Sequence, residues 1–216
     1  VLYLSRFEER RRLLDRSGVD LVVPLDFDLE ISRLQEGEFV TILIRELGMR
    51  GLVAGPDFAL GHQRQGALSV LMRLGEELGF GVHVVEFAAV EDVTPSSSAI
   101  REALTHGDVT RAGMMLGRPF ALEGRVIHGE HRGNQLGFPT ANLDFDEDMA
   151  LPADGIYATW VCRGTERYLS TTCIGKRPTF GFHARTVETF VMDFSGDLYD
   201  EDLRVEFARY LRPEYR

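Results

Sequence analysis

The chain has 216 residues and a formal net charge of −10 at pH 7, with 44% hydrophobic and 27% charged residues. These proportions are ordinary for a globular protein, and the excess negative charge argues against general binding to nucleic acid or to an anionic membrane. No apolar run approaches the roughly 18 residues of a membrane span, and we find no secretory leader. Cys162 and Cys173 are the only cysteines, which favours reduced thiols in a cytoplasmic protein.

The first half of the chain alternates helical and strand-like patterns. Residues 5–18 predict a helix that begins with Ser5 and Glu8 at capping-box spacing and ends at Gly18. The β-branched run 19–25 predicts a buried strand. Further helices are predicted at 36–47, 66–79, 96–107 and 108–117, and further strands at 50–55 and 81–87. Strands separated by helices indicate an α/β layer with a parallel sheet and right-handed crossovers.

The pattern changes after Arg118 and Pro119. Short β-rich runs separated by Gly, Pro or Asp follow, at 120–129, 155–163, 167–175, 185–194 and 203–207. This spacing without a clear helix favours an all-β antiparallel barrel or sandwich. We therefore divide the chain into an α/β part, residues 1–117, and an all-β part, residues 118–216.

The segment "HGEHRGNQLGFPTAN", residues 128–142, combines backbone-permissive and hydrogen-bonding residues. Its glycines permit positive φ and close approach of a ligand to the backbone; they are Gly129, Gly133 and Gly137. Arg132 has the fork geometry that suits phosphate oxygens. If the chain stays extended beyond Pro139, Thr140 and Asn142 point to the same side, where their oxygens suit Mg²⁺ bridging nucleotide phosphates. The alternative is a glycine-rich turn between barrel strands.

The run "RTVETFVMDF", residues 185–194, places one carboxylate in an apolar strand. Alternation puts Val187 and Val191 on one face and Glu188 with Phe190 on the other. A charge among apolar neighbours costs free energy unless it is exposed or partnered. Glu188 is therefore a candidate catalytic carboxylate, and an ordinary glutamate on the barrel surface is the alternative.

These motifs carry a resemblance to a known family. "GRVIHGEHRGNQLGFPTANL" resembles the flavokinase signature of the bacterial bifunctional riboflavin kinase/FAD synthetase family. The match continues in the family's order through "LPADGIYA", "IGKRPTFG", "RTVETFVMDFSGDLYDEDLRVEF" and "LRPE". The resemblance implies that the all-β part is a six-stranded Greek-key barrel that transfers the γ-phosphoryl group of ATP to riboflavin, giving FMN.

The resemblance also implies roles for individual residues. Thr140 and Asn142 match the pair that holds Mg²⁺ and the ATP phosphates, and Glu188 matches the acidic residue that receives the proton of the attacking hydroxyl. Arg132, Gly133 and Gly137 belong to the phosphate-binding segment before that pair. Such a site agrees with phosphoryl transfer, which depends mostly on positioning and charge neutralisation.

The α/β part resembles the later portion of the family's FMN adenylyltransferase, an incomplete Rossmann-like nucleotidyltransferase domain. "GPDFALGHQRQG" and "SSSAIREAL" match two of its segments. The ligand-binding residues this implies are Asp57, Phe58, Arg64, Ser97, Ser98 and Arg101. A serine cluster that opens a helix is also an ordinary N-cap, and the same residues suit a phosphate cradle. Asp57 and Arg64 could equally lie on a loop surface.

The family's first strand–loop–helix, with its Gly-Phe-Asp-Gly-Val-His-x-Gly-His motif, is not found in the sequence, nor is the helix that follows the barrel in relatives. We therefore expect a chain truncated at both ends that phosphorylates riboflavin but does not adenylylate FMN. Two alternatives remain open: a flavin- or nucleotide-binding module without turnover, and an assembly module. The expected partners are riboflavin, ATP and FMN, with no nucleic acid or membrane, and self-association is left open.

Overall fold

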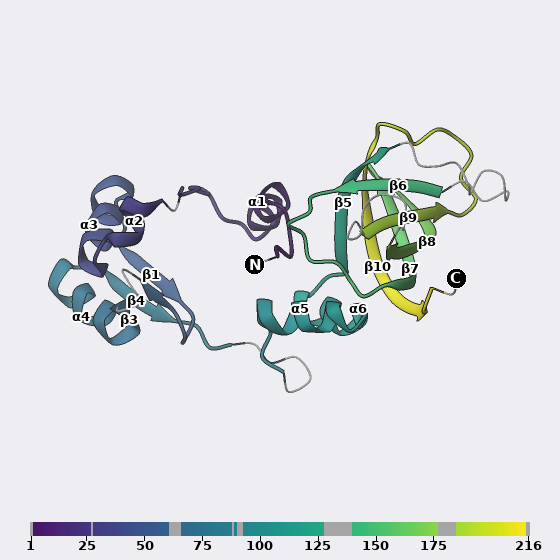
Figure 1. Cartoon of the computed structure of the whole chain (residues 1–216). Coiled ribbons are helices and arrows are strands. Elements are labelled where there is room, and N and C mark those ends of the chain that lie inside the picture. Colours follow the sequence, from purple (N-terminus) through teal and green to yellow (C-terminus); the bar gives the residue numbers. More distant parts are fainter. Residues whose placement is uncertain are drawn as a thin grey trace. The chain divides into compact units, whose positions relative to one another are not determined.

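The structure, a computed structural model, describes residues 2–26, 28–60, 66–87, 89, 93–127, 140–176 and 185–214. The chain forms two compact units (Figure 1). One consists of Val1–Val19 with Val90–Arg216, and the other of Asp20–Ala89. The boundary between residues 117 and 118, which concerns the two functional parts of the chain, stays a prediction.

The smaller unit contains a parallel βαβ arrangement, as the alternating pattern predicted. Its elements are α2 (Leu29–Arg33), α3 (Glu36–Leu47), β1 (Gly51–Ala54), β2 (Ala59–Leu60), β3 (Gly66–Ala67), α4 (Leu68–Leu78) and β4 (Gly81–Val84). Strands β1 and β4 pair in parallel. Val40 of α3 and Leu71 of α4 are fully buried in this unit's core, where Phe80 is also largely buried.

Two predictions for the start of the chain are wrong. Residues 19–25 do not form a strand, and Leu21 is 71% exposed. A strand needs a neighbour for its backbone groups, and in the described chain β1 and β4 pair only with each other. The Ser5 capping box is also absent, because α1 (Phe7–Arg16) has Arg6 as its N-cap and Glu8 pairs with Arg11 at 3.4 Å.

The larger unit is built on a closed six-stranded barrel, which confirms the predicted all-β architecture. Its strands are β5 (Phe120–Ile127), β6 (Thr140–Phe145), β7 (Gly155–Arg163), β8 (Glu166–Lys176), β9 (Arg185–Val191) and β10 (Asp202–Arg212). They follow one another around the barrel in the order β10-β5-β6-β9-β8-β7, and every neighbouring pair is antiparallel. The order β10-β7-β8-β9 within this ring is a Greek key.

The barrel interior is filled by side chains. Most are apolar, and Phe120, Tyr157 and Phe207 are the largest of those fully buried. The interior also contains a chain of hydroxyl hydrogen bonds, in which Thr172 lies 2.8 Å from Thr159 and 2.9 Å from Thr189.

Helices α5 (Ser97–Thr105) and α6 (Val109–Leu116) pack against the barrel (Figure 1). Asp108 caps α6 by accepting a hydrogen bond from the Arg111 amide at 3.0 Å, and Gly117 ends it with a φ of 67°, both as predicted. Buried residues of both helices, including Leu104 and Ala112, belong to the same hydrophobic cluster as the barrel core. None of the described helices is both long and apolar enough to span a bilayer.

Candidate active site on the outer face of the barrel

Strand β6 presents the two predicted metal-binding residues on one face. Ala141 and Leu143 are buried in the barrel core, whereas Thr140 and Asn142 are half-buried. Side chains alternate across a strand, so Thr140 and Asn142 point outward, as expected for an extended chain beyond Pro139. Both supply an oxygen atom that a hard cation can accept as a ligand.

Strand β9 brings the predicted catalytic carboxylate to the same face. Val187, Thr189 and Val191 are buried, so Glu188 points outward with Phe190. In the antiparallel pairing of β6 with β9, Asn142 lies directly opposite Glu188. Side chains directly opposite one another have Cβ atoms about 4.5–5.5 Å apart. Three residues selected from two separate motifs therefore come together on two neighbouring strands.

Strand β8 borders the site on the other side of β9. Cys173 lies directly opposite Glu188. The pKa of the Cys173 thiol is raised to about 11, first by burial and then by the negative charges of Glu214 and Glu188, in that order of importance. The thiol is therefore protonated near neutral pH and supplies neither a nucleophile nor a metal ligand in that form.

The two cysteines are free, as the sequence predicted. In the pairing of β7 with β8, Cys162 lies opposite Arg167 while Cys173 lies opposite Ile156. The two thiols are thus on neighbouring strands but several residues apart along them. This register keeps them from forming a disulfide with one another.

The remaining predicted ligand residues lie in different parts of the chain. Arg132, Gly133 and Gly137 of the phosphate-binding segment lie outside the described residues, as does Arg64. Asp57 and Phe58 lie in the turn that follows β1, in the smaller unit. Their roles stay predictions.

The serine cluster opens helix α5 in the larger unit. Ser96, one residue before the predicted pair Ser97 and Ser98, is the N-cap, and its hydroxyl accepts a hydrogen bond from the Ala99 amide at 3.2 Å. Arg101 donates a hydrogen bond from Nε to the backbone carbonyl of Leu2 at 2.6 Å. Capping is thus part of what the serine cluster does here, and Arg101 ties the start of the chain to α5.

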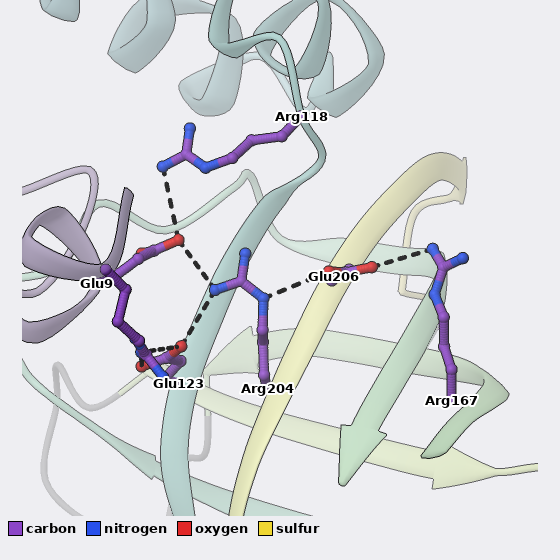
Figure 2. A network of polar contacts seen from close by, with 7 residues as sticks. Glu9, Arg118, Glu123, Arg167, Arg204 and Glu206 are labelled. Atoms are coloured by element: carbon purple, nitrogen blue, oxygen red, sulfur yellow. Dashed lines mark hydrogen bonds and ion pairs between the residues drawn. The ribbon is translucent and has the colours of Figure 1, made fainter. Parts of the chain in front are cut away.

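An ion-pair network that sequence reasoning missed lies elsewhere on the barrel surface (Figure 2). Glu9 of α1 is only 5% exposed and accepts a hydrogen bond from Arg204 of β10 at 2.9 Å. Arg118 approaches the same carboxylate at 3.5 Å. Figure 2 shows Arg204 at the centre, with Glu123 and Glu206 as its other carboxylate partners.

This network attaches a helix rather than forming part of the site. Burial lowers the pKa of Arg204, but hydrogen bonds to its glutamate partners, Glu9 first among them, more than offset this effect, so the guanidinium is held charged. Glu9 and Arg204 are 195 residues apart in the sequence. No local signal in the sequence identifies such a pair.

Comparisons with known proteins match both parts of the chain. A family profile described as riboflavin kinase matches residues 116–216, and one described as FAD synthetase matches residues 1–99. The bifunctional riboflavin kinase/FMN adenylyltransferase of Listeria monocytogenes is 31% identical over 217 residues, covering 100% of this chain and 69% of that protein. The protein of the same name from Escherichia coli K12 is 34% identical over 215 residues, covering 99% of this chain and 68% of that protein.

A solved structure also matches the chain over its full length. It is named a macrolide-efflux protein from Streptococcus pneumoniae, and it matches with a TM-score of 0.91 and 31% sequence identity. The match covers 100% of this chain and 69% of that one. This name indicates an activity different from that of the Listeria and Escherichia proteins, so it is the fold of that structure that bears on the present chain.

Proposed function

Because the chain belongs to the family of bifunctional riboflavin kinase/FMN adenylyltransferases, we propose that its barrel phosphorylates riboflavin with ATP, giving FMN and ADP. The observation that carries this proposal is the pairing of Asn142 with Glu188 on the outer face, with Thr140 on the same face of β6. These are the residues that the resemblance assigns to the metal, the phosphates and the proton.

In the proposed reaction, the 5′-hydroxyl oxygen of riboflavin forms a bond to the γ-phosphorus of ATP. The bond from that phosphorus to the bridging oxygen breaks, and ADP leaves with the bond's electrons. Glu188 takes the hydroxyl proton, for which a carboxylate on the open face of the strand is well suited. General-base help of this kind accelerates a reaction by roughly 10²–10⁴-fold.

The residues present fit a bound Mg²⁺. Thr140 and Asn142 place a hydroxyl and an amide carbonyl on one face of β6. Among the described residues, no group of three or more His, Cys, Asp or Glu side chains could hold a metal ion. A protein site with few ligands suits Mg²⁺, which usually keeps waters and binds substrate phosphates. When bound, the ion would neutralise charge on the ATP phosphates, and we assign their remaining contacts to Arg132, Gly133 and Gly137.

The family's second activity, adenylylation of FMN, involves a separate set of proposed ligand residues. They are Asp57, Phe58, Arg64, Ser97, Ser98 and Arg101. Arg101 already donates to the Leu2 carbonyl, so contact with a phosphate would require that hydrogen bond to be shared or exchanged. The free thiols of Cys162 and Cys173 support a reducing compartment, the cytoplasm, as the place where the protein works.

The test is to incubate the full chain with riboflavin, ATP and Mg²⁺ and to separate riboflavin, FMN and FAD by chromatography. We expect FMN, with a loss of roughly 10²–10⁴-fold in kcat for Glu188→Gln and a marked loss for Thr140→Ala. Glu147→Gln, at an exposed position of the same unit, is the matched control. Wild-type activity in Glu188→Gln would remove the proposed base. Riboflavin binding without any FMN would favour a binding module, and the FAD peak reports the second activity directly.

A further inference from the structure

The carboxylate of Glu214, which follows the end of β10, lies against a glycine beside the candidate site. Gly175 of β8 is buried, although alternation along the strand places it on the outer face with Cys173. A Cβ atom added to Gly175 would lie 2.3 Å from Oε2 of Glu214, 3.1 Å from its Cδ and 3.4 Å from its Oε1. The three nearest atoms are thus all from one carboxylate, which covers the glycine directly.

The need for glycine at position 175 comes from the space that a side chain would occupy, and not from the backbone conformation. Gly175 is not among the residues with positive φ in the described chain, so an L-amino acid could adopt its backbone geometry. Any side chain there would displace the Glu214 carboxylate, since real Cβ atoms essentially never approach another heavy atom within 3.0 Å. Gly175 therefore provides the seat for that carboxylate.

This seat lies close to the proposed catalytic base. Gly175 lies opposite Thr186 on β9, and Cys173 lies opposite Glu188. Diagonal neighbours on paired strands are about 7–8 Å apart, so the Glu214 carboxylate sits about one diagonal step from Glu188. Consistent with this placement, the negative charges of Glu214 and of Glu188 each raise the pKa of the Cys173 thiol.

The chemistry of this pair favours a ligand with several hydroxyl groups. The described residues hold no cluster of three His, Cys, Asp or Glu side chains suited to a metal ion, and carboxylates are strong acceptors for hydroxyl donors. The ribityl chain of riboflavin carries internal hydroxyls next to the 5′-hydroxyl that reacts. Two carboxylates about one diagonal step apart on paired strands can contact two hydroxyls of one such chain.

We propose that Glu214, seated on Gly175, is a specificity-determining residue that accepts a hydrogen bond from an internal ribityl hydroxyl of riboflavin. This contact holds the chain so that its 5′-hydroxyl faces Glu188. The inference rests on the proposed riboflavin kinase activity and adds to it the group that recognises the polyol portion of the substrate.

The test compares two substrates and two kinds of variant in the full chain. Glu214→Gln and Glu214→Ala change the acceptor directly, while Gly175→Ala leaves the carboxylate intact but displaces it. Gly113→Ala, where an added Cβ would be 3.5 Å from the nearest atom, is the matched glycine control. The substrates are riboflavin and a flavin whose side chain keeps the terminal hydroxyl but lacks the internal ones. Flavin fluorescence measures Kd without turnover, and FMN formation gives KM and kcat.

A hydrogen bond to a charged acceptor is worth roughly ten- to a hundredfold in affinity. We expect Glu214→Ala and Gly175→Ala to raise Kd and KM for riboflavin by about that factor, with the KM for ATP unchanged. For the analogue without internal hydroxyls, variants and wild type should have the same Kd.

Equal losses for both flavins, or no change in riboflavin Kd, would overturn the inference. A fall in kcat at unchanged Kd would also overturn it, because Glu214 would then act on the reaction step rather than on binding. If the wild-type chain binds riboflavin but forms no FMN, the proposed kinase activity fails, while the Kd comparison still decides the role of Glu214.

Discussion

Helix α1 depends on charged side chains for its attachment to the barrel, so a substitution that removes one charge tests this part of the structure directly. Glu9 is the only residue of α1 that is buried, and the helix as a whole is strongly polar. Apolar burial therefore contributes little to its contact with the barrel. Glu9→Gln retains the size of the side chain but removes the charge that Arg204 and Arg118 approach.

The size of the effect follows from the surroundings of Arg204. Removing one partner of a buried ion pair typically costs about 3–5 kcal/mol because the other charge is left uncompensated. Here the Arg204 side chain is 25% exposed and keeps Glu123 and Glu206 as partners. We therefore reduce the expected loss to about 2 kcal/mol, which lowers Tm by about 4–8 °C in a protein of this size.

The assay combines thermal unfolding, followed by circular dichroism, with hydrogen exchange of the α1 amides. Glu8→Gln is the control, because its pair with Arg11 is exposed on both sides and surface pairs contribute little. The backbone of Tyr3 stays hydrogen-bonded to Asp148 and Ala150, so the effect of Glu9→Gln should be local to α1. The α1 amides should therefore lose protection from hydrogen exchange before the barrel amides do. An unchanged Tm together with unchanged protection of α1 in Glu9→Gln would refute the idea that the ion pairs of Glu9 hold the helix.

The barrel itself allows three further predictions. Thr172→Val should lower the free energy of unfolding by about 2 kcal/mol, measured by denaturant titration, because two buried hydroxyls, those of Thr159 and Thr189, each lose a hydrogen bond. The thiol of Cys173 has its pKa raised from 9.0 to about 11, so its stabilising contribution is complete below about pH 9 and is lost as pH rises towards 11. Cys173→Ser should therefore flatten the fall in unfolding free energy between pH 9 and 11. Identical pH profiles of the variant and the wild type would contradict this. Gly124→Ala should destabilise the barrel by about 3 kcal/mol in the same titration, because its Cβ would lie 2.2 Å from the Asp144 carbonyl oxygen.

The parts of the site that follow from local periodicity were predictable from the sequence. A strand has a period of two residues, so the faces of β6 and β9 could be assigned as soon as those segments were taken to be extended. That Thr140 and Asn142 face away from Ala141 follows from this rule alone, and the structure agrees. The family resemblance supplied the chemical roles, which periodicity cannot give.

The parts that depend on distant segments were not predictable. Residues 19–25 have the composition of a buried strand, yet composition says nothing about whether a partner strand exists, and the segment is irregular. The burial of Glu9 depends on Arg204, at the other end of the sequence. The Glu214 seat likewise requires β8 and the end of β10 to meet. In each case the structure is decided by a tertiary contact, which the local propensities of the residues cannot predict.

The placement of the candidate site on the outer face couples its geometry to the packing of the core. The same register that sets Asn142 opposite Glu188 also sets Leu143 opposite Val187, and those two side chains are buried. A shift of one residue would turn Glu188 into the core and Val187 to solvent, which burial energy strongly opposes. The alignment of the proposed base with the proposed metal residues is therefore stabilised by the apolar interior, and no separate interaction is needed to hold the two strands in this alignment.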